Sequence, residues 1–125
     1  MISINIPSVV QELSEVFEQY EAALVCNDVK VLDALFWNNP NTIRYGATEN
    51  LYGFEQIQSF RLGRLPVGLE RQVLKTVITT YGEDFATANI EFQREGSNRI
   101  GRQSQTWVKF PQGWKVVSAH VSLIG

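Results

Sequence analysis

Residues 69–125 read LERQVLKTVITTYGEDFATANIEFQREGSNRIGRQSQTWVKFPQGWKVVSAHVSLIG, and this C-terminal half sets the architecture. It is rich in β-branched residues, which favour extended chain, and short turns interrupt it. Strands joined by short turns pair with their sequence neighbours in an antiparallel sheet. The expected strands are Leu69–Tyr81, Phe85–Arg94, Ile100–Phe110 and Trp114–Ile124.

The residues before this stretch predict mainly helices. From Pro7 to Cys26 apolar side chains recur every three or four residues, the pattern of an amphipathic helix. Shorter helices are expected over Val29–Phe36 and Phe54–Leu62, and short strands over Thr42–Tyr45 and Leu51–Tyr52. This order predicts an α+β class, with N-terminal helices packed in the concave face of a curved antiparallel sheet.

Length and charge limit the function classes. A chain of 125 residues corresponds to a single domain, residues 1–125. The net charge of −2 provides no basic field for nucleic acid, and no apolar stretch is long enough to span a membrane. The N-terminus lacks the features of a signal peptide, so we expect a cytoplasmic protein.

Metal-binding residues are scarce. The single cysteine, Cys26, excludes an internal disulfide and is expected to be buried and inert. The single histidine, His120, cannot build a histidine-rich metal site, and no acidic cluster compensates. We therefore expect no metal.

Arginines near the middle of the chain suggest a pocket for a small acid. Arg44 lies in a β-like stretch, where burial is costly unless an anion or carboxylate neutralises it. Either a ligand or Glu49, across the predicted hairpin, serves that purpose. Arg61 and Arg64 share one side of a helix, which suits a second carboxylate as well as plain surface exposure.

The last two strands offer further polar side chains. Ser118, His120 and Ser122 alternate along the final strand and share the parity of Trp114. We expect them to line the pocket, although His120 suits a core position equally well. On the preceding strand we expect the face that carries Arg102 to point inward.

Several long motifs resemble a known family. The order of elements, ending in W-[KR]-[IV]-V-x-x-H-x-S, resembles the cystatin-like cone of the nuclear transport factor 2, ketosteroid isomerase and SnoaL superfamily. More closely, four segments resemble the AtzH-like/HpxZ-like family: FWNNPNTIRYGATENLYG (36–53), TTYGEDFATANIEF (79–92), GRQSQTW (101–107) and GWKVVSAHVSL (113–123).

This resemblance implies the breakdown of small nitrogen-rich acids. One branch of the family is linked to decarboxylation of 1,3-dicarboxyurea to allophanate, and another accompanies oxalurate catabolism, often beside amidases. The family's catalytic tyrosine and arginine align with Tyr20 and Arg44. Tyr20 also lies on the apolar stripe of its helix, so a purely structural role stays open.

The decarboxylation that the resemblance implies needs few catalytic groups. An N-carboxylate loses carbon dioxide once its nitrogen accepts a proton, so an anion clamp and a proton donor suffice without an obligatory cofactor. A guanidinium fork matches a carboxylate, and a tyrosine hydroxyl donates a proton.

Two other classes remain open. The first is a non-catalytic binding or assembly partner of an amidase, with Gln103, Gln105 and Trp107 on an outer sheet face; a homodimer through that face is expected in either case. The second is a proton shuttle on a neutral ketone, which requires a buried carboxylate base.

Overall fold

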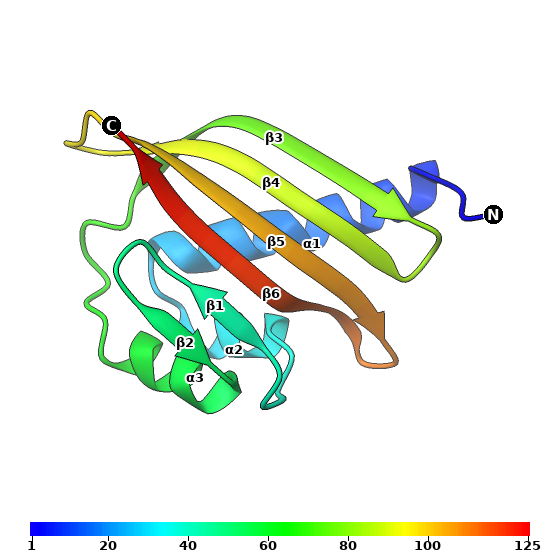
Figure 1. The fold of residues 1–125 in the computed structure, drawn as a ribbon, viewed down its shortest axis with the longest axis horizontal. Coiled ribbons are helices and arrows are strands. Elements are labelled where there is room, and N and C mark those ends of the chain that lie inside the picture. Colours follow the sequence, from blue (N-terminus) through cyan, green and yellow to red (C-terminus); the bar gives the residue numbers. More distant parts are fainter.

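Six strands form one curved sheet, and three helices lie on its concave side (Figure 1). The computed structural model describes residues 1–125. In chain order the elements are α1 (Pro7–Val25), α2 (Val29–Leu35), β1 (Ile43–Tyr45), β2 (Asn50–Tyr52), α3 (Phe54–Leu62), β3 (Arg71–Tyr81), β4 (Phe85–Arg94), β5 (Ile100–Phe110) and β6 (Gly113–Ile124). The predicted α+β class and helix-first order are confirmed, with element ends within two residues of those expected. No helix combines the length and apolar character needed to cross a bilayer.

One strand pair departs from the expected antiparallel pattern. The strand order is β2-β1-β6-β5-β4-β3, and β1 pairs with β6 in parallel while all other pairs are antiparallel. The chain leaves β1, passes through β2, α3 and the long meander, and returns beside β1 in the same direction. Phe36 extends this pairing through a parallel bridge to Val116. The sheet is therefore mixed: the four long strands pair antiparallel as expected, and β1 adds one parallel pair.

Helix α1 fills the concavity. Its first turn begins at Pro7, where the missing N–H of proline costs nothing. Its buried stripe, which includes Leu13 and Phe17, belongs to one core cluster with Trp107 from the sheet. Ala86 and Ala88 on β4 are completely buried, and their small side chains leave room on the concave face. The core thus lies between α1 and the inner face of the sheet.

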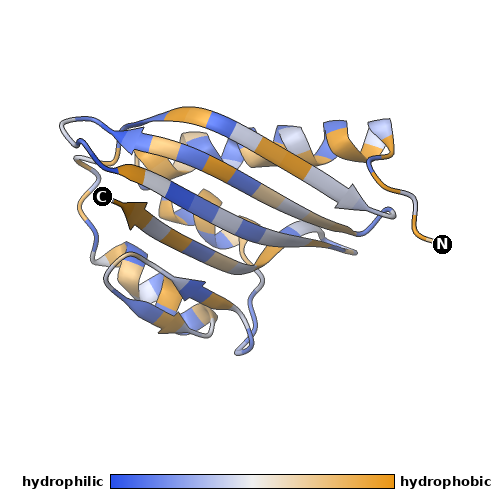
Figure 2. Cartoon of the chain, turned by 45° about the horizontal axis from the view of Figure 1, so that its top comes forward, coloured by the Kyte–Doolittle hydropathy of each residue, from blue (hydrophilic) through white to orange (hydrophobic).

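A β-bulge in β6 reverses the facing of its last residues. Thr106 pairs with Ser118 whereas Trp107 pairs with Val116, so Val117 is an extra residue with no partner on β5. Before the bulge Val116 faces the core; after it Ala119 and Val121 do so. Alternating hydropathy along the long strands is visible in Figure 2.

The predicted inward facing of several residues is therefore wrong. Ser118 and His120 are exposed, because simple alternation from Trp114 ignores the extra residue. On β5 the inner face carries Gln103, Gln105 and Trp107, and Arg102 lies on the outer face. Cys26 is also exposed rather than buried, since it caps the C-terminal end of α1.

Neighbouring substitutions in β6 test the bulge. Ala119→Lys places an ammonium in the core beside the guanidinium of Arg44, its register partner on β1, and should lower the free energy of unfolding by at least about 3 kcal/mol. Ser118→Lys, one residue earlier, should change it by no more than about 0.5 kcal/mol because the side chain stays in solvent. Urea denaturation measures both values. The opposite ranking would show that β6 runs without the bulge.

Candidate functional site

Side chains from α1, from five strands and from the segment between α3 and β3 line one small cavity between α1 and the sheet. Its volume is about 10 Å³, which is room for about one water molecule. The lining residues are Tyr20, Leu24, Arg44, Arg64, Leu69, Arg71, Arg94, Gln103 and Val121. The structure therefore brings together three of the residues expected from the sequence, Tyr20, Arg44 and Arg64. Arginines are the commonest residue type in this lining.

Tyr20 is both a core residue and a cavity residue. Its side chain is only 3% exposed, and its ring lies against Phe17, Phe36 and Trp107 at centroid distances of 6.2, 6.2 and 6.4 Å. These contacts fix the ring and leave the phenol at the wall of the cavity. The position of Tyr20 is therefore compatible both with a structural role in the core and with a catalytic role in the cavity.

Arg44 likewise satisfies both expectations. It is 9% exposed, lines the cavity, and donates from Nη1 to Oε1 of Glu49 at 2.9 Å. Partial burial raises the pKa of Glu49, but hydrogen bonds from Thr48 and Arg44 outweigh it and hold that pKa below its usual value. Only Nη1 of Arg44 is used in this pair, so its other donors are free for a ligand.

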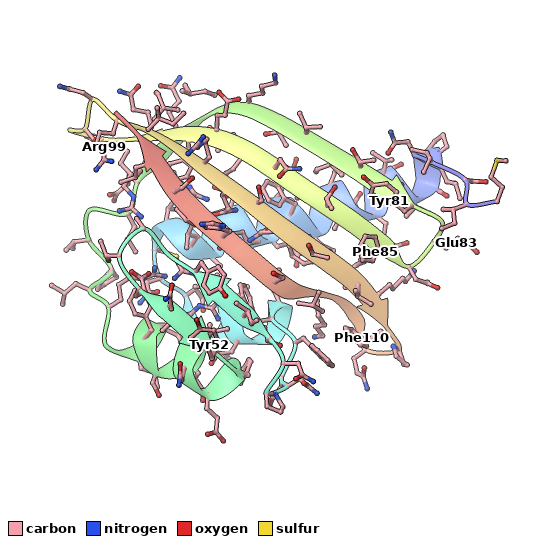
Figure 3. All side chains as sticks on the ribbon, viewed as in Figure 1. Tyr52, Tyr81, Glu83, Phe85, Arg99 and Phe110 are labelled. Atoms are coloured by element: carbon pink, nitrogen blue, oxygen red, sulfur yellow. The ribbon has the colours of Figure 1, made fainter.

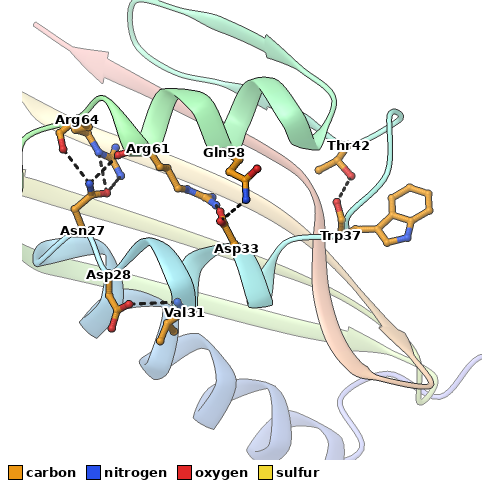
Figure 4. A network of polar contacts seen from close by, with 9 residues as sticks. All are labelled: Asn27, Asp28, Val31, Asp33, Trp37, Thr42, Gln58, Arg61 and Arg64. Atoms are coloured by element: carbon orange, nitrogen blue, oxygen red, sulfur yellow. Dashed lines mark hydrogen bonds and ion pairs between the residues drawn. The ribbon is translucent and has the colours of Figure 1, made fainter.

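Arg61 and Arg64 separate into different environments (Figure 4). Arg61 pairs with Asp33 at 3.3 Å and does not line the cavity. Arg64 donates from Nε and Nη2 to Oδ1 of Asn27, at 3.3 and 3.0 Å. Asn27 in turn donates from Nδ2 to the backbone oxygens of Arg61 and Arg64. Burial, followed by the nearby charge of Arg44, lowers the pKa of Arg64 to about 10, so its guanidinium remains protonated at neutral pH.

Three polar cavity residues were missed by sequence reasoning. Arg71 and Arg94 are register partners on β3 and β4, and Gln103 lies on β5. The Arg71 side chain is 2% exposed and donates hydrogen bonds from Nε and Nη2 to the carboxylate of Glu21. A second β-bulge, between Val73 and Lys75, shifts the register just after Arg71, so alternation along the rest of β3 does not show which face Arg71 is on.

The cluster carries uncompensated positive charge. The cluster contains three carboxylates, those of Glu21, Asp33 and Glu49. It contains five guanidinium groups, those of Arg44, Arg61, Arg64, Arg71 and Arg94. Arg64 and Arg94 have no carboxylate partner. Burial lowers the pKa of Arg94, and the charges of Arg71 and Arg44 lower it further. Arg64 is half-buried and Arg94 is exposed, so water solvates part of this excess charge.

A larger hollow adjoins this cluster. It measures about 450 Å³, has no hydrophobic lining residue, and shares Arg71 and Arg94 with the small cavity. The two shared side chains mark the outer side of the cavity.

Four expected pocket residues lie elsewhere. Arg102, Ser118, His120 and Ser122 project from the outer face of the sheet, where Arg102 donates from Nε to Oγ of Ser122 at 3.2 Å. Their predicted place in the cavity is wrong: the bulge in β6 turns Ser118, His120 and Ser122 outward, and on β5 it is the opposite face, with Gln103 and Gln105, that is buried. No group of three or more His, Cys, Asp or Glu side chains is arranged to hold a metal ion. A proton shuttle on a neutral ketone would require a carboxylate base in the cavity. No aspartate or glutamate lines it.

Comparisons with known proteins agree with this fold. The sequence profile of the AtzH-like family matches residues 2–125. A protein of unknown function from the DUF3225 family of Pectobacterium atrosepticum is 56% identical, with a TM-score of 0.96 over 98% of this chain and 95% of that chain. A cystatin-like fold protein from Burkholderia xenovorans is 44% identical, with a TM-score of 0.95 over 100% and 98%.

A more distant structure extends the likeness. A nuclear transport factor 2-like superfamily protein from Salmonella enterica serovar Typhimurium is 25% identical, with a TM-score of 0.76 over 92% of this chain and 90% of that chain. No curated protein matches the sequence.

The buried pair of Arg71 and Glu21 provides a stability test of the cluster. Glu21→Gln leaves a guanidinium in the interior without its counter-charge and should lower the free energy of unfolding by about 3–5 kcal/mol. Glu12→Gln, which removes the exposed pair with Lys109, should have a much smaller effect because water screens it. Chemical denaturation at neutral pH compares the two. Equal losses would mean that Arg71 is solvated in solution.

Proposed function

The chain belongs to the AtzH-like family, and on this basis we propose that it binds a small dicarboxylate and decarboxylates an N-carboxylated urea without a cofactor. The substrate class includes 1,3-dicarboxyurea and related acids of oxalurate catabolism. The observation that carries the proposal is that Tyr20 and the buried Arg44 line one cavity with two guanidinium groups that lack a carboxylate partner, those of the half-buried Arg64 and the exposed Arg94.

The binding step follows from charge. A dianion supplies the two negative charges that the cluster lacks. Arg44 would hold the reacting carboxylate with the donors that Glu49 leaves free. Arg64 and Arg94 would hold the other carboxylate. Hydrogen bonds between charged groups are about twice as strong as neutral ones, and burial strengthens them.

The chemical step requires one proton. As the bond between nitrogen and the carboxylate carbon breaks, its electron pair goes to nitrogen and carbon dioxide leaves. The Tyr20 hydroxyl would give its proton to that nitrogen, and solvent would restore it. Burial is the main cause of the lowered pKa of Arg61, and a negative charge on Tyr20 would oppose that shift. The positive charges of the arginines near Tyr20 would therefore stabilise its phenolate until solvent restores the proton.

A ligand can enter the small cavity only if the surrounding side chains or backbone move. A dicarboxylate is larger than the space present, so the side chains or the segment 63–70 that carries Arg64 and Leu69 must move outward. Gly68 in this segment has a positive φ of 72° and no close neighbour. The adjoining hollow gives a polar route toward Arg94 and Arg71.

We also propose that two copies associate through the outer face of the sheet. All three helices lie on the other side, so this face is uncovered. Tyr45 contacts His120 and Tyr52 there, at ring centroid distances of 5.6 and 6.0 Å, and Figure 3 shows Tyr52 at the surface. A stable interface would bury about 1,200–2,000 Å² in total.

Matched substitutions test the catalytic pair. Losing a charged hydrogen bond to substrate costs about 1.5–3 kcal/mol, so Arg44→Lys should lower kcat/KM by roughly ten- to hundred-fold. Tyr20→Phe keeps the packed ring and should lower kcat while leaving stability nearly unchanged. The assay follows carbon dioxide or allophanate release from 1,3-dicarboxyurea that an upstream amidase generates in place.

Arg102→Lys and Tyr81→Phe are the controls, because both positions lie outside the cavity. They should retain full activity. If the wild-type chain binds no small dicarboxylate and Tyr20→Phe alters only stability, the decarboxylase proposal fails. A non-catalytic assembly partner of an amidase then replaces it.

Association is tested at the middle of the sheet. Ser104→Arg sets an exposed charge at the centre of the outer face and should convert the dimer to a monomer. Glu55→Arg, an exposed charge change on α3, should leave the dimer intact. Sedimentation velocity at micromolar concentration separates the two states. A monomeric wild-type chain would contradict the dimer.

A further inference from the structure

The amide of Gln103 has one satisfied end and one unsatisfied end. Its Oε1 accepts a hydrogen bond from Nη2 of Arg71 at 3.1 Å, whereas its Nε2 has no partner. The assignment of oxygen and nitrogen is chemically fixed, because a guanidinium only donates. The residue is 2% exposed, so an acceptor for this N–H has to lie inside the cavity that Gln103 lines.

Arg71 holds this amide in a single orientation. The same guanidinium is bound to Glu21 through Nε and Nη2, and it lies over the ring of Phe92 at 4.2 Å. These contacts immobilise Arg71 and, through it, Gln103. The result is a rigid neutral donor in the wall of the cavity that Tyr20 and Arg44 also line.

We propose that Gln103 determines specificity by donating from Nε2 to a neutral carbonyl oxygen of the ligand. This inference rests on the proposed dicarboxylate function and narrows its substrate class to diacids that carry an amide, urea or ketone carbonyl between the carboxylates. The arginines match the carboxylates, and a neutral amide donor matches a neutral acceptor. Sites built to hydrogen-bond a substrate group discriminate against analogues that lack it.

Gln105 is a natural control on the same strand. It is equally buried, its Oε1 accepts from Nε1 of Trp107 at 3.1 Å, and its Nε2 also lacks a partner. However, Gln105 does not line the cavity. Any effect of burying an unsatisfied amide is therefore common to both residues, whereas contact with ligand belongs to Gln103 alone.

Two diacids that differ only at the central carbon test the proposal. 3-Oxoglutarate has the chain length of 1,3-dicarboxyurea and its central carbonyl, and glutarate has a methylene there. Calorimetric titration in the cold with freshly dissolved ligand should give wild-type Kd values about five- to tenfold lower for 3-oxoglutarate, the range of one hydrogen bond. Gln103→Met should bind both diacids equally. Gln105→Met should keep the wild-type preference.

The outcomes separate this inference from the broader proposal. Equal wild-type affinity for the two diacids overturns the role of Gln103 but leaves dicarboxylate binding standing. A preference that survives Gln103→Met overturns it as well. If neither diacid binds the wild-type chain, both proposals fail. If Gln103→Met does not fold, Gln103→Leu makes the same comparison.

Discussion

Buried positive charge is the dominant constraint on this structure. Each guanidinium that enters the interior must find a carboxylate, an aromatic face or a ligand, since an isolated buried ion is very costly. Three of the five find a carboxylate, and four lie over a phenylalanine ring. Such contacts attract cations through the ring quadrupole. The buried guanidinium groups, those of Arg44, Arg61 and Arg71, are each paired with a carboxylate, and the unpaired charges of Arg64 and Arg94 lie where the cluster meets solvent.

Most of the fold is readable from local patterns. The amphipathic period of α1 and the short turns between the long strands depend on residues close together in sequence, so the element order and the α+β class follow from them. Parallel pairing of β1 with β6 joins segments more than seventy residues apart, and no local pattern encodes it. The extra residue Val117 is equally invisible to an alternation argument.

The candidate site also combines residues that the sequence indicates with residues that only the three-dimensional structure brings together. Tyr20 and Arg44 are marked by motif resemblance and by residue type, and they line one cavity. Arg71 and Gln103 become neighbours only through strand register, so their relation appears in the structure alone. Ser118 and His120 were assigned to the cavity from spacing, and the bulge turns them to the opposite face.

Asn27 ties the segment that carries Arg64 to the end of α1. Its side chain bonds to two backbone oxygens and to one guanidinium, so it acts as a latch that holds the cavity residue Arg64 in place. A ligand that enters past Arg64 has to wait for these bonds to open together. Capture would then be limited by the frequency of opening rather than by diffusion, and the observed association rate would reach a ceiling as ligand concentration rises. The same latch would lengthen the residence time of any ligand once inside.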